Sequence, residues 1–316
     1  MILQMVVDKL RPIKRKMHHH IITRRPKAAR HALRRDGLDE FVAQSDRLGG
    51  PGAPACEAYW QNVEYHPSLM IDKRQDPFGA AYAGAQMRLY EELSGHPYRH
   101  EQDEQTALDI DGHVAAINPY NHPDPAVMGV HLQRLARALS CAKAAKDEVL
   151  LDMGCGWGLS SEVAAYMGLR VIGVDINKNF VELVNRRAAR TSYPISAVHG
   201  SFDGFEPAQP VDLILFYECL HHAVDPLATV TRYAQALRPG GRMVLAGEPV
   251  NDMWWPHWGL RLDPLSIYCI RKFGWFESGW SRQHITEVMR RAGLVPIVHH
   301  HADPAVGPAI IGTKLL

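Results

Sequence analysis

Three glycines stand at alternate positions, directly after an apolar run, in the stretch VLLDMGCGWGLS at residues 149–160. A glycine-rich turn between a strand and a helix lets a ligand approach the backbone N–H groups that open the helix. A dinucleotide-binding turn has the spacing G-x-G-x-x-G, whereas Gly154, Gly156 and Gly158 are spaced G-x-G-x-G. Asp152, two residues before the first glycine, would repel a pyrophosphate but could organise a cationic amino group or the turn itself.

A second acid lies near the end of the following apolar run, GVDI, where Asp175 stands 17 residues after Gly158. A carboxylate at such a strand end can accept one hydrogen bond from each hydroxyl of a ribose. The same acid could instead cap the next helix, but Asn177 already suits that position. We therefore interpret Asp175 as a ribose ligand, a role that dinucleotide sites and other nucleoside sites share.

Strand and helix patterns alternate from residue 148 onward, and this order must position the glycine turn and both acids. Apolar runs predict the strands, and the stretches between them have helical spacing or helix-cap signals. Strands that alternate with helices predict an α/β fold, a doubly wound parallel sheet with helices on both faces. The predicted strands are 148–154, 170–176, 195–201, 211–218 and 242–250, with two closing strands at 295–301 and 309–316.

Helices are expected before this region and within it. Residues 78–95 have helical spacing and end in a glycine, and a second helix begins at Asp124 or Pro125, after a turn-rich loop. Further helices are expected at 157–168, 177–191, 225–241 and 281–294.

Three stretches follow one another along the chain: VLLDMGCGWG, then GVDI, then FYECLHHAVDPLATVTRYAQALRPGGRMVLAGEP. Together they resemble a class I S-adenosylmethionine-dependent methyltransferase, similar to the type 11 and type 12 methyltransferases. The resemblance covers about residues 148–250, and the order of elements extends it to the C-terminus. It implies a Rossmann-like, mostly parallel seven-stranded sheet with an antiparallel closing strand, and S-adenosyl-L-methionine as the cofactor.

The resemblance also implies where the methionine part of the cofactor binds. The turn backbone at Gly154 and Gly156 would hold it, with Asp152 nearby. Tyr217 and Glu218, at the end of the fourth predicted strand, would border the same methionine end.

The adenine side is implied by the next two strand ends. Ile176 and Phe202 would lie against the adenine. In GSFDGF, Ser201 stands where the family often carries an acid for the adenine amino group, so Asp203 is the alternative partner. The predicted cofactor-binding residues are Asp152, Gly154, Cys155, Gly156, Gly158, Asp175, Ile176, Ser201, Phe202, Asp203 and Tyr217.

Methyl transfer from a sulfonium is an in-line displacement, so the protein mainly aligns the acceptor and excludes water. A hydroxyl or protonated amine acceptor also needs a general base. Glu218, His221 and His222 follow the fourth strand and are the candidate catalytic residues. Alternatively, Leu-His-His is a structural loop signature whose histidines bond backbone groups. Cys155 occupies a tight turn position and is not expected to act as a nucleophile.

An insertion at residues 251–280 separates the fifth strand from the next helix and is too long for a bare connection. We expect it to form an aromatic lid, whose rings stack on a sugar or planar acceptor or build the core of a small cap. Its basic side chains could pair with an anionic acceptor. The insertion is loosely similar to methyltransferases of bacterial polysaccharide or natural-product biosynthesis. The residues concerned are Trp254, Trp255, Trp258, Trp275, Trp280, Arg261, Arg271 and Lys272.

The composition is that of an ordinary globular protein, with 316 residues of which 46% are hydrophobic and 22% charged. No apolar run approaches the roughly 20 residues that a membrane-spanning helix needs. The apolar start MILQMVV is followed, not preceded, by charge, which disfavours a signal peptide. Five scattered cysteines show neither metal spacing nor a disulfide framework, so we expect a cytoplasmic protein without a metal site.

Charged residues are distributed unevenly along the chain. Residues 1–35 carry eleven lysines and arginines against one acid, a net charge of +10, and the remainder carries −9. We expect a basic arm and Gly/Pro-rich linker at 1–55, an N-terminal helical segment on the substrate side at 56–145, and the cofactor-binding domain with its lid at 146–316. The arm could contact nucleic acid, anionic lipid or an acidic partner, but a solvated terminus is the simpler interpretation.

The predicted function is methylation of a small molecule, with O-methylation of a sugar-containing or other polar metabolite as the specific hypothesis. An NAD-dependent oxidoreductase is disfavoured by the glycine spacing and the Leu-His-His loop. A nucleic-acid methyltransferase that uses the basic arm is disfavoured because the rest of the chain is acidic, and nucleic acid is not an expected partner. A relative that only binds the cofactor is the remaining alternative.

Overall fold

The computed structural model describes residues 31–105, 107–253 and 256–316. These residues form two compact units. The sheet unit contains residues 107–250 and 282–316, and the accessory unit contains the described residues of 31–105 and 251–281. The predicted arm up to residue 30, together with Trp254 and Trp255 of the insertion, lies outside the described residues. The segment boundaries at residues 55 and 145 stay predictions.

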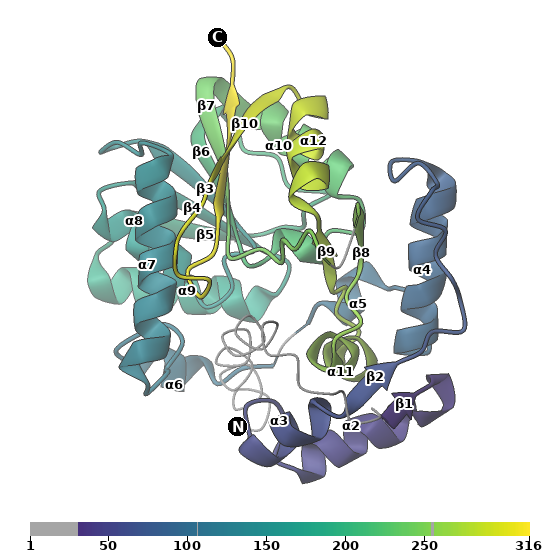
Figure 1. Cartoon of the computed structure of the whole chain (residues 1–316). Helices are drawn as coiled ribbons and strands as arrows, with labels where there is room; N and C mark the ends of the chain where they lie inside the picture. Colours follow the sequence, from purple (N-terminus) through teal and green to yellow (C-terminus); the bar gives the residue numbers. More distant parts are fainter. Residues whose placement is uncertain (1–30, 106, 254–255) are drawn as a thin grey trace. The chain divides into compact units, whose positions relative to one another are not determined.

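The sheet unit is built on a seven-stranded sheet in the order β10-β11-β7-β6-β3-β4-β5 (Figure 1). The strands from β7 to β5 in this order run parallel, and β11 is antiparallel to both of its neighbours. This arrangement confirms the predicted Rossmann-like sheet and its antiparallel closing strand. Central strands are buried almost throughout, as expected where helices cover both faces. The strands are β3 (Val149–Met153), β4 (Arg170–Asp175), β5 (Ile195–His199), β6 (Val211–Tyr217), β7 (Leu237–Ala246), β10 (Leu294–His299) and β11 (Ala309–Lys314).

Helices cover both faces of this sheet. In Figure 1, α7 and α8 lie side by side on one face, and α10 and α12 lie together on the other. Asp124, Asn177 and Asp225 cap α7, α9 and α10, as the sequence predicts. None of the described helices combines the length and apolar composition that a membrane crossing requires. The helices are α6 (Ile110–Ala115), α7 (Pro125–Cys141), α8 (Leu159–Tyr166), α9 (Lys178–Thr191), α10 (Pro226–Ala236) and α12 (Arg282–Arg291).

The boundary between α10 and β7 differs from the sequence prediction. The helix expected at 225–241 ends at Ala236, and β7 begins at the next residue. Arg238 precedes a proline, and the proline ring disfavours helical backbone at the residue before it. Leu237 instead pairs with Val211 of β6, so the chain is already extended there.

The accessory unit has regular structure inside residues 31–55, where composition suggests an arm and a linker. The helix α2 (Leu38–Arg47) buries Leu38 and Phe41, and Ser45 accepts a hydrogen bond from the Trp60 indole at 2.9 Å. An amphipathic helix with a buried face needs a partner, and the following helix supplies it. The other elements are β1 (His31–Leu33), α3 (Pro54–Trp60), β2 (Val63–Tyr65), α4 (Ala80–Ser94) and α5 (His100–Asp103).

The predicted insertion is an ordered part of this unit, with β8 (Trp258–Leu260), α11 (Pro264–Phe273) and β9 (Ser278–Trp280). Its aromatic rings pack in a core. The ring of Tyr268 lies 5.8 Å from that of Trp60, and Trp258 lies 5.6 Å from Tyr82. Trp280 is fully buried. These contacts favour the interpretation of the aromatic residues as a cap core, while their use as a lid stays a prediction.

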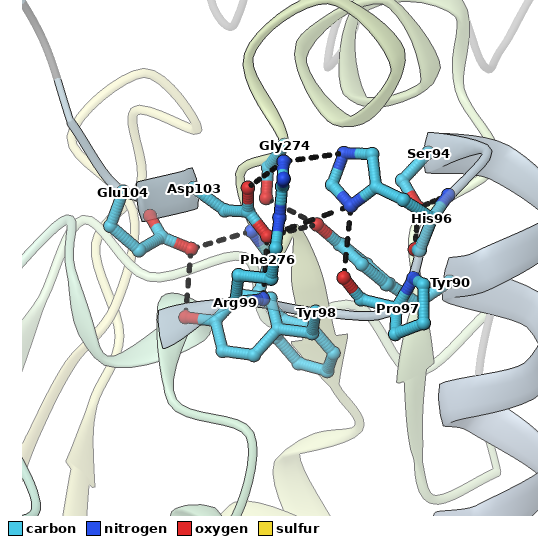
Figure 2. A network of polar contacts seen from close by, with 10 residues as sticks. All are labelled: Tyr90, Ser94, His96, Pro97, Tyr98, Arg99, Asp103, Glu104, Gly274 and Phe276. Carbon is cyan, nitrogen blue, oxygen red and sulfur yellow. Dashed lines mark hydrogen bonds and ion pairs between the residues drawn. The ribbon is translucent and has the colours of Figure 1, made fainter. Parts of the chain in front are cut away.

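A polar network fastens the insertion to α4 and to the residues that follow this helix (Figure 2). The Tyr90 hydroxyl donates to the Gly274 carbonyl at 2.6 Å, and Glu104 accepts from the Phe276 N–H at 2.8 Å. Gly274 has φ +72°, and a Cβ there would lie 2.9 Å from atoms of Asp103. A glycine is therefore required where α11 ends against this network.

Candidate active site

The glycine turn joins β3 to α8 at the carboxyl edge of the sheet. Gly154, Gly156 and Gly158 have φ of +62°, +51° and +84°, in the left-handed region that side chains rarely adopt. A Cβ on Gly154 would lie 2.9 Å from Cys219, and one on Gly158 would lie 2.8 Å from Val184. A Cβ on Gly156 would meet only a backbone oxygen, at 4.0 Å. The outer glycines therefore permit close packing, and the middle one borders the open space that a ligand needs.

Asp152 lies at the end of β3 and is completely buried. Its Oδ2 atom accepts hydrogen bonds from the hydroxyls of Ser160 at 2.7 Å and Ser161 at 2.6 Å, both in the first turn of α8. Its Oδ1 atom has no hydrogen-bond partner among the described residues. Burial raises the pKa of Asp152 to about 6, although the two serine hydroxyls lower it. Asp152 therefore fastens the turn to α8 and is ionised at neutral pH.

Asp175 ends β4, beside the turn. Its Oδ2 atom accepts from the Gly156 N–H at 2.9 Å, and its Oδ1 atom accepts from the Asn177 N–H at 2.8 Å. Burial raises the pKa of Asp175 to about 6, although these two backbone hydrogen bonds lower it. Each carboxylate oxygen can accept a second hydrogen bond. Two carboxylates at one turn disfavour a pyrophosphate and suit a ligand that carries hydroxyls and positive charge.

The residues expected to bind the adenine, which are Ile176, Ser201, Phe202 and Asp203, differ in burial and in how close they lie to the turn. Ile176 is half-buried directly after Asp175. The ring of Phe202 reaches the turn, since its Cζ atom would lie 3.6 Å from a Cβ on Gly154. The Ser201 hydroxyl accepts from a backbone N–H three residues on, at 3.1 Å, and Asp203 is exposed.

Two neighbouring residues at the end of β6 join a cluster with α7. The Tyr217 hydroxyl lies 2.6 Å from the Nδ1 atom of His131. Glu218 pairs with the guanidinium of Arg134, and its Oε2 atom lies 3.7 Å from the same histidine nitrogen. Burial lowers the pKa of Arg134, but the Glu218 carboxylate raises it, and the net change is upward. Arg134 is therefore charged, and the pair holds opposite charges beside the turn.

A second carboxylate organises the loop after β6. Glu248 accepts from the backbone N–H groups of Cys219, Leu220 and His221 at 2.9, 2.9 and 3.2 Å. It also lies 2.9 Å from the His221 Nδ1 atom, and both side chains are 2% exposed. The ring of His222 packs on that of His221, with centroids 4.3 Å apart. A carboxylate thus orients the Nδ1 side of His221, one of the three predicted catalytic residues.

His131, Arg134 and Glu248 also belong to the site, although no sequence motif singles them out. His131 and Arg134 are three residues apart on α7, so they share a helix face, but they stand 86 and 84 positions before their partners Tyr217 and Glu218. Glu248 stands two residues after β7, which neighbours β6. The signal that could have found it is its place at a carboxyl strand end next to the Leu-His-His loop.

Two cysteines at the turn, Cys155 and Cys219, are buried. Burial raises the pKa of Cys155 and of Cys219 well above the usual value, so both are thiols at neutral pH. None of the five cysteines, all of which lie within the described residues, forms a disulfide.

Comparison with known proteins identifies a family and supports the fold. A family model described as a methyltransferase domain matches residues 120–300, more than half of the chain. A ubiquinone biosynthesis O-methyltransferase of Cereibacter sphaeroides (strain ATCC 17029 / ATH 2.4.9) is 27% identical over 192 residues, 57% of this chain and 75% of that protein. A protein of the same name from Rhodopseudomonas palustris (strain HaA2) is 31% identical over 122 residues, 39% of this chain and 46% of that protein. A chain of the Haloferax volcanii complex that contains the Trm112 methyltransferase activator has a TM-score of 0.50 and 18% identity, covering 67% of this chain and all of that one, which supports the fold.

The chain therefore belongs to the methyltransferase domain family. Family and fold together confirm the predicted class, an S-adenosylmethionine-dependent methyltransferase. The residues at the turn fit this cofactor. Gly156 leaves open space, Asp175 has acceptor capacity for two hydroxyls, and buried carboxylates suit a sulfonium cation.

Proposed function

We propose that this enzyme transfers a methyl group from S-adenosylmethionine to a hydroxyl oxygen of a small polar acceptor, with His221 as general base. The names of the relatives, O-methyltransferases of ubiquinone biosynthesis, support oxygen as the accepting atom. The observation that carries the proposal is the buried pair of His221 and Glu248, joined at 2.9 Å at the carboxyl ends of two neighbouring strands.

This pair has the arrangement of a general base. Glu248 at the Nδ1 atom fixes the tautomer in which the Nε2 atom of His221 carries a lone pair, and it stabilises the imidazolium that forms. Bound S-adenosylmethionine supplies a methyl group on a positively charged sulfur, which leaves as a neutral thioether. The acceptor oxygen forms the new bond to the methyl carbon as the carbon–sulfur bond breaks, and His221 Nε2 takes the hydroxyl proton.

The turn residues bind and orient in this proposal. Asp175 holds the ribose hydroxyls, the backbone at Gly154 and Gly156 lies against the methionine part, and Phe202 and Ile176 flank the adenine. The distances from Asp175 to two backbone N–H groups support its role, because they fix the carboxylate in one orientation before the ligand binds. A cytoplasmic location also belongs to the proposal, supported by the five cysteines that form no disulfide.

The test compares two adjacent histidines. His221→Gln should lower kcat about 100- to 10,000-fold, the usual contribution of a general base, and should remove the acidic limb of the pH profile. His222→Gln is the matched control, because it changes the neighbouring ring without touching Glu248. S-adenosylhomocysteine affinity should be unchanged in both. Equal losses in the two variants, or an intact pH profile in His221→Gln, would show that Glu248 and His221 only shape the loop.

The acceptor is found by a screen with methyl-labelled cofactor. We expect label in a phenol or a sugar hydroxyl, and none in nucleic acid. Label transferred only to a nitrogen, carbon or sulfur atom would contradict the proposal of O-methylation.

A further inference from the structure

An open groove lies between α7 and α8, the two helices that stand side by side on one face of the sheet (Figure 1). Its volume is about 860 Å³, and sixteen of the described residues line it. All of them belong to the sheet unit, and none is a residue to which the proposed function gives a role. The groove is therefore a separate feature of this unit.

Both helices present a stripe of apolar side chains to the groove. On α7 the stripe is Met128, Leu132 and Ala136, and on α8 it is Leu159, Val163 and Met167. Residues four apart form one ridge along a helix. Because α7 leads into β3 and α8 leads away from it, both helices run from the carboxyl edge of the sheet towards the amino edge. The groove thus lies between two parallel ridges, and ridges of another helix pair can pack into it.

Large apolar side chains stay exposed around this groove. Ten such side chains are exposed in the described residues, and four of them line the groove: Ile117, Leu132, Tyr166 and Met167. Ile117 is 97% exposed and Tyr166 is 80% exposed. Single exposed hydrophobic residues are normal, but a contiguous apolar patch marks an interaction surface.

Polar groups in the wall of the groove are paired within the chain. Asn118 bonds both the N–H and the carbonyl of His122, and Glu162 pairs with Arg187 at 2.6 Å. The His122 Nδ1 atom accepts from the Asp124 N–H at 3.1 Å. An apolar partner can therefore cover these groups without breaking a hydrogen bond or burying an unpaired charge.

The extent of the patch favours a protein partner over a small molecule. Ile117 precedes the start of α7 and Tyr166 ends α8, so they stand at opposite ends of the groove. A small molecule in the groove would leave both of these side chains in water. Specific protein interfaces take about 20–30 residues from each side, and the lining of the groove supplies sixteen.

We propose that this face is the interface of a homodimer, in which α7 and α8 of one copy pack antiparallel on α7 and α8 of a second copy. In a two-fold interface one patch meets itself, so it must be self-complementary. A two-fold axis that crosses the middle of the groove brings Ile117 beside Tyr166 of the partner subunit, and the ridges of each copy fill the groove of the other. Antiparallel helix dipoles also favour this arrangement. The inference does not depend on the proposed function.

The experiment measures the association of the full chain by analytical ultracentrifugation. Wild-type protein should sediment as a dimer of two 316-residue chains at micromolar concentration. Ile117→Glu and Tyr166→Lys each put a charge into an apolar contact, and each should raise the dissociation constant at least about 30-fold, as loss of a hot-spot residue does. The double variant should regain association, because the new carboxylate of one copy then lies beside the new ammonium group of the other.

Met70→Glu is the matched control, because Met70 is 95% exposed but lies in the accessory unit, and this variant should stay dimeric. Wild-type protein that is monomeric throughout the micromolar range overturns the inference. Native mass spectrometry of that monomer would then show whether a small apolar molecule occupies the groove instead. A dimer that persists in both single variants, or a double variant that associates no better than they do, also overturns it.

Discussion

Replacing Asp175 by asparagine separates the ligand-binding role of this carboxylate from its effect on stability. The side chain accepts one hydrogen bond from the Gly156 N–H at 2.9 Å and one from the Asn177 N–H at 2.8 Å. Asparagine keeps one acceptor oxygen and puts an NH2 group in place of the other. One of the two backbone N–H groups therefore loses its partner, and the site loses its negative charge.

The two effects on stability oppose each other. A carboxyl whose pKa is about 6 in the fold, against an ordinary value of 3.8, is destabilising by about 3 kcal/mol once ionised, at about 1.4 kcal/mol per pKa unit. Asparagine removes that cost, while an unsatisfied buried N–H costs about 1–3 kcal/mol. The free energy of unfolding at pH 7.5 should therefore change by no more than about 2 kcal/mol.

Affinity should change much more. A carboxylate that accepts from a ribose hydroxyl is a charged hydrogen-bond partner worth about 1.5–3 kcal/mol, so S-adenosylhomocysteine should bind about 10- to 150-fold more weakly to Asp175→Asn. In wild-type protein the affinity should also fall as the pH drops below about 6, the pKa of Asp175, because protonation removes the charge. The affinity of the variant should depend less on pH in that window.

The sign of the stability change with pH is fixed by the raised pKa. The folded protein holds the Asp175 proton more tightly than the unfolded chain, so ionisation destabilises the fold as the pH rises from about 4 to about 6. Over that window wild-type protein should lose stability relative to Asp175→Asn, as measured by urea unfolding. Unchanged S-adenosylhomocysteine affinity in the variant, or a stability difference that moves in the opposite direction, would refute the reasoning.

Three further substitutions test the packing that positions the site. Gly158→Ala forces a Cβ to 2.8 Å from Val184 at φ +84°, and should lower the free energy of unfolding by about 1–3 kcal/mol in urea titrations. Arg187→Met leaves Glu162, its partner at 2.6 Å, without a buried counter-charge and should cost about 3–5 kcal/mol; a smaller loss than about 1 kcal/mol would contradict this. Tyr90→Phe removes the 2.6 Å hydrogen bond to the C-terminal end of α11 and should cost about 1 kcal/mol, with cofactor affinity unchanged in calorimetry.

The sheet could be predicted from the sequence because its signals are local. The apolar run before Gly154, the acid at the end of β4 and the caps Asn177 and Asp225 each specify one element through its own residues. Right-handed crossovers then leave few arrangements for parallel strands that alternate with helices. The glycine turn was predictable for the same reason, since its spacing reflects the positive φ of three residues.

The partners of the candidate catalytic residues were not predictable. Glu218 and Arg134 are 84 positions apart, and His221 and Glu248 are 27 apart. Their contacts arise only when helices and strands distant in the sequence become neighbours, and the sequence shows no period that links them. The same holds for α2, whose buried Phe41 packs on Trp60, and Trp60 in turn packs on Tyr268.

Calorimetric titration of the full chain with S-adenosylhomocysteine, in parallel with NAD, tests the central claim most directly. The account predicts that S-adenosylhomocysteine binds and that NAD gives no heat of binding, because the turn has the wrong glycine spacing for a pyrophosphate and is flanked by Asp152 and Asp175. Binding of NAD with no binding of S-adenosylhomocysteine would contradict it.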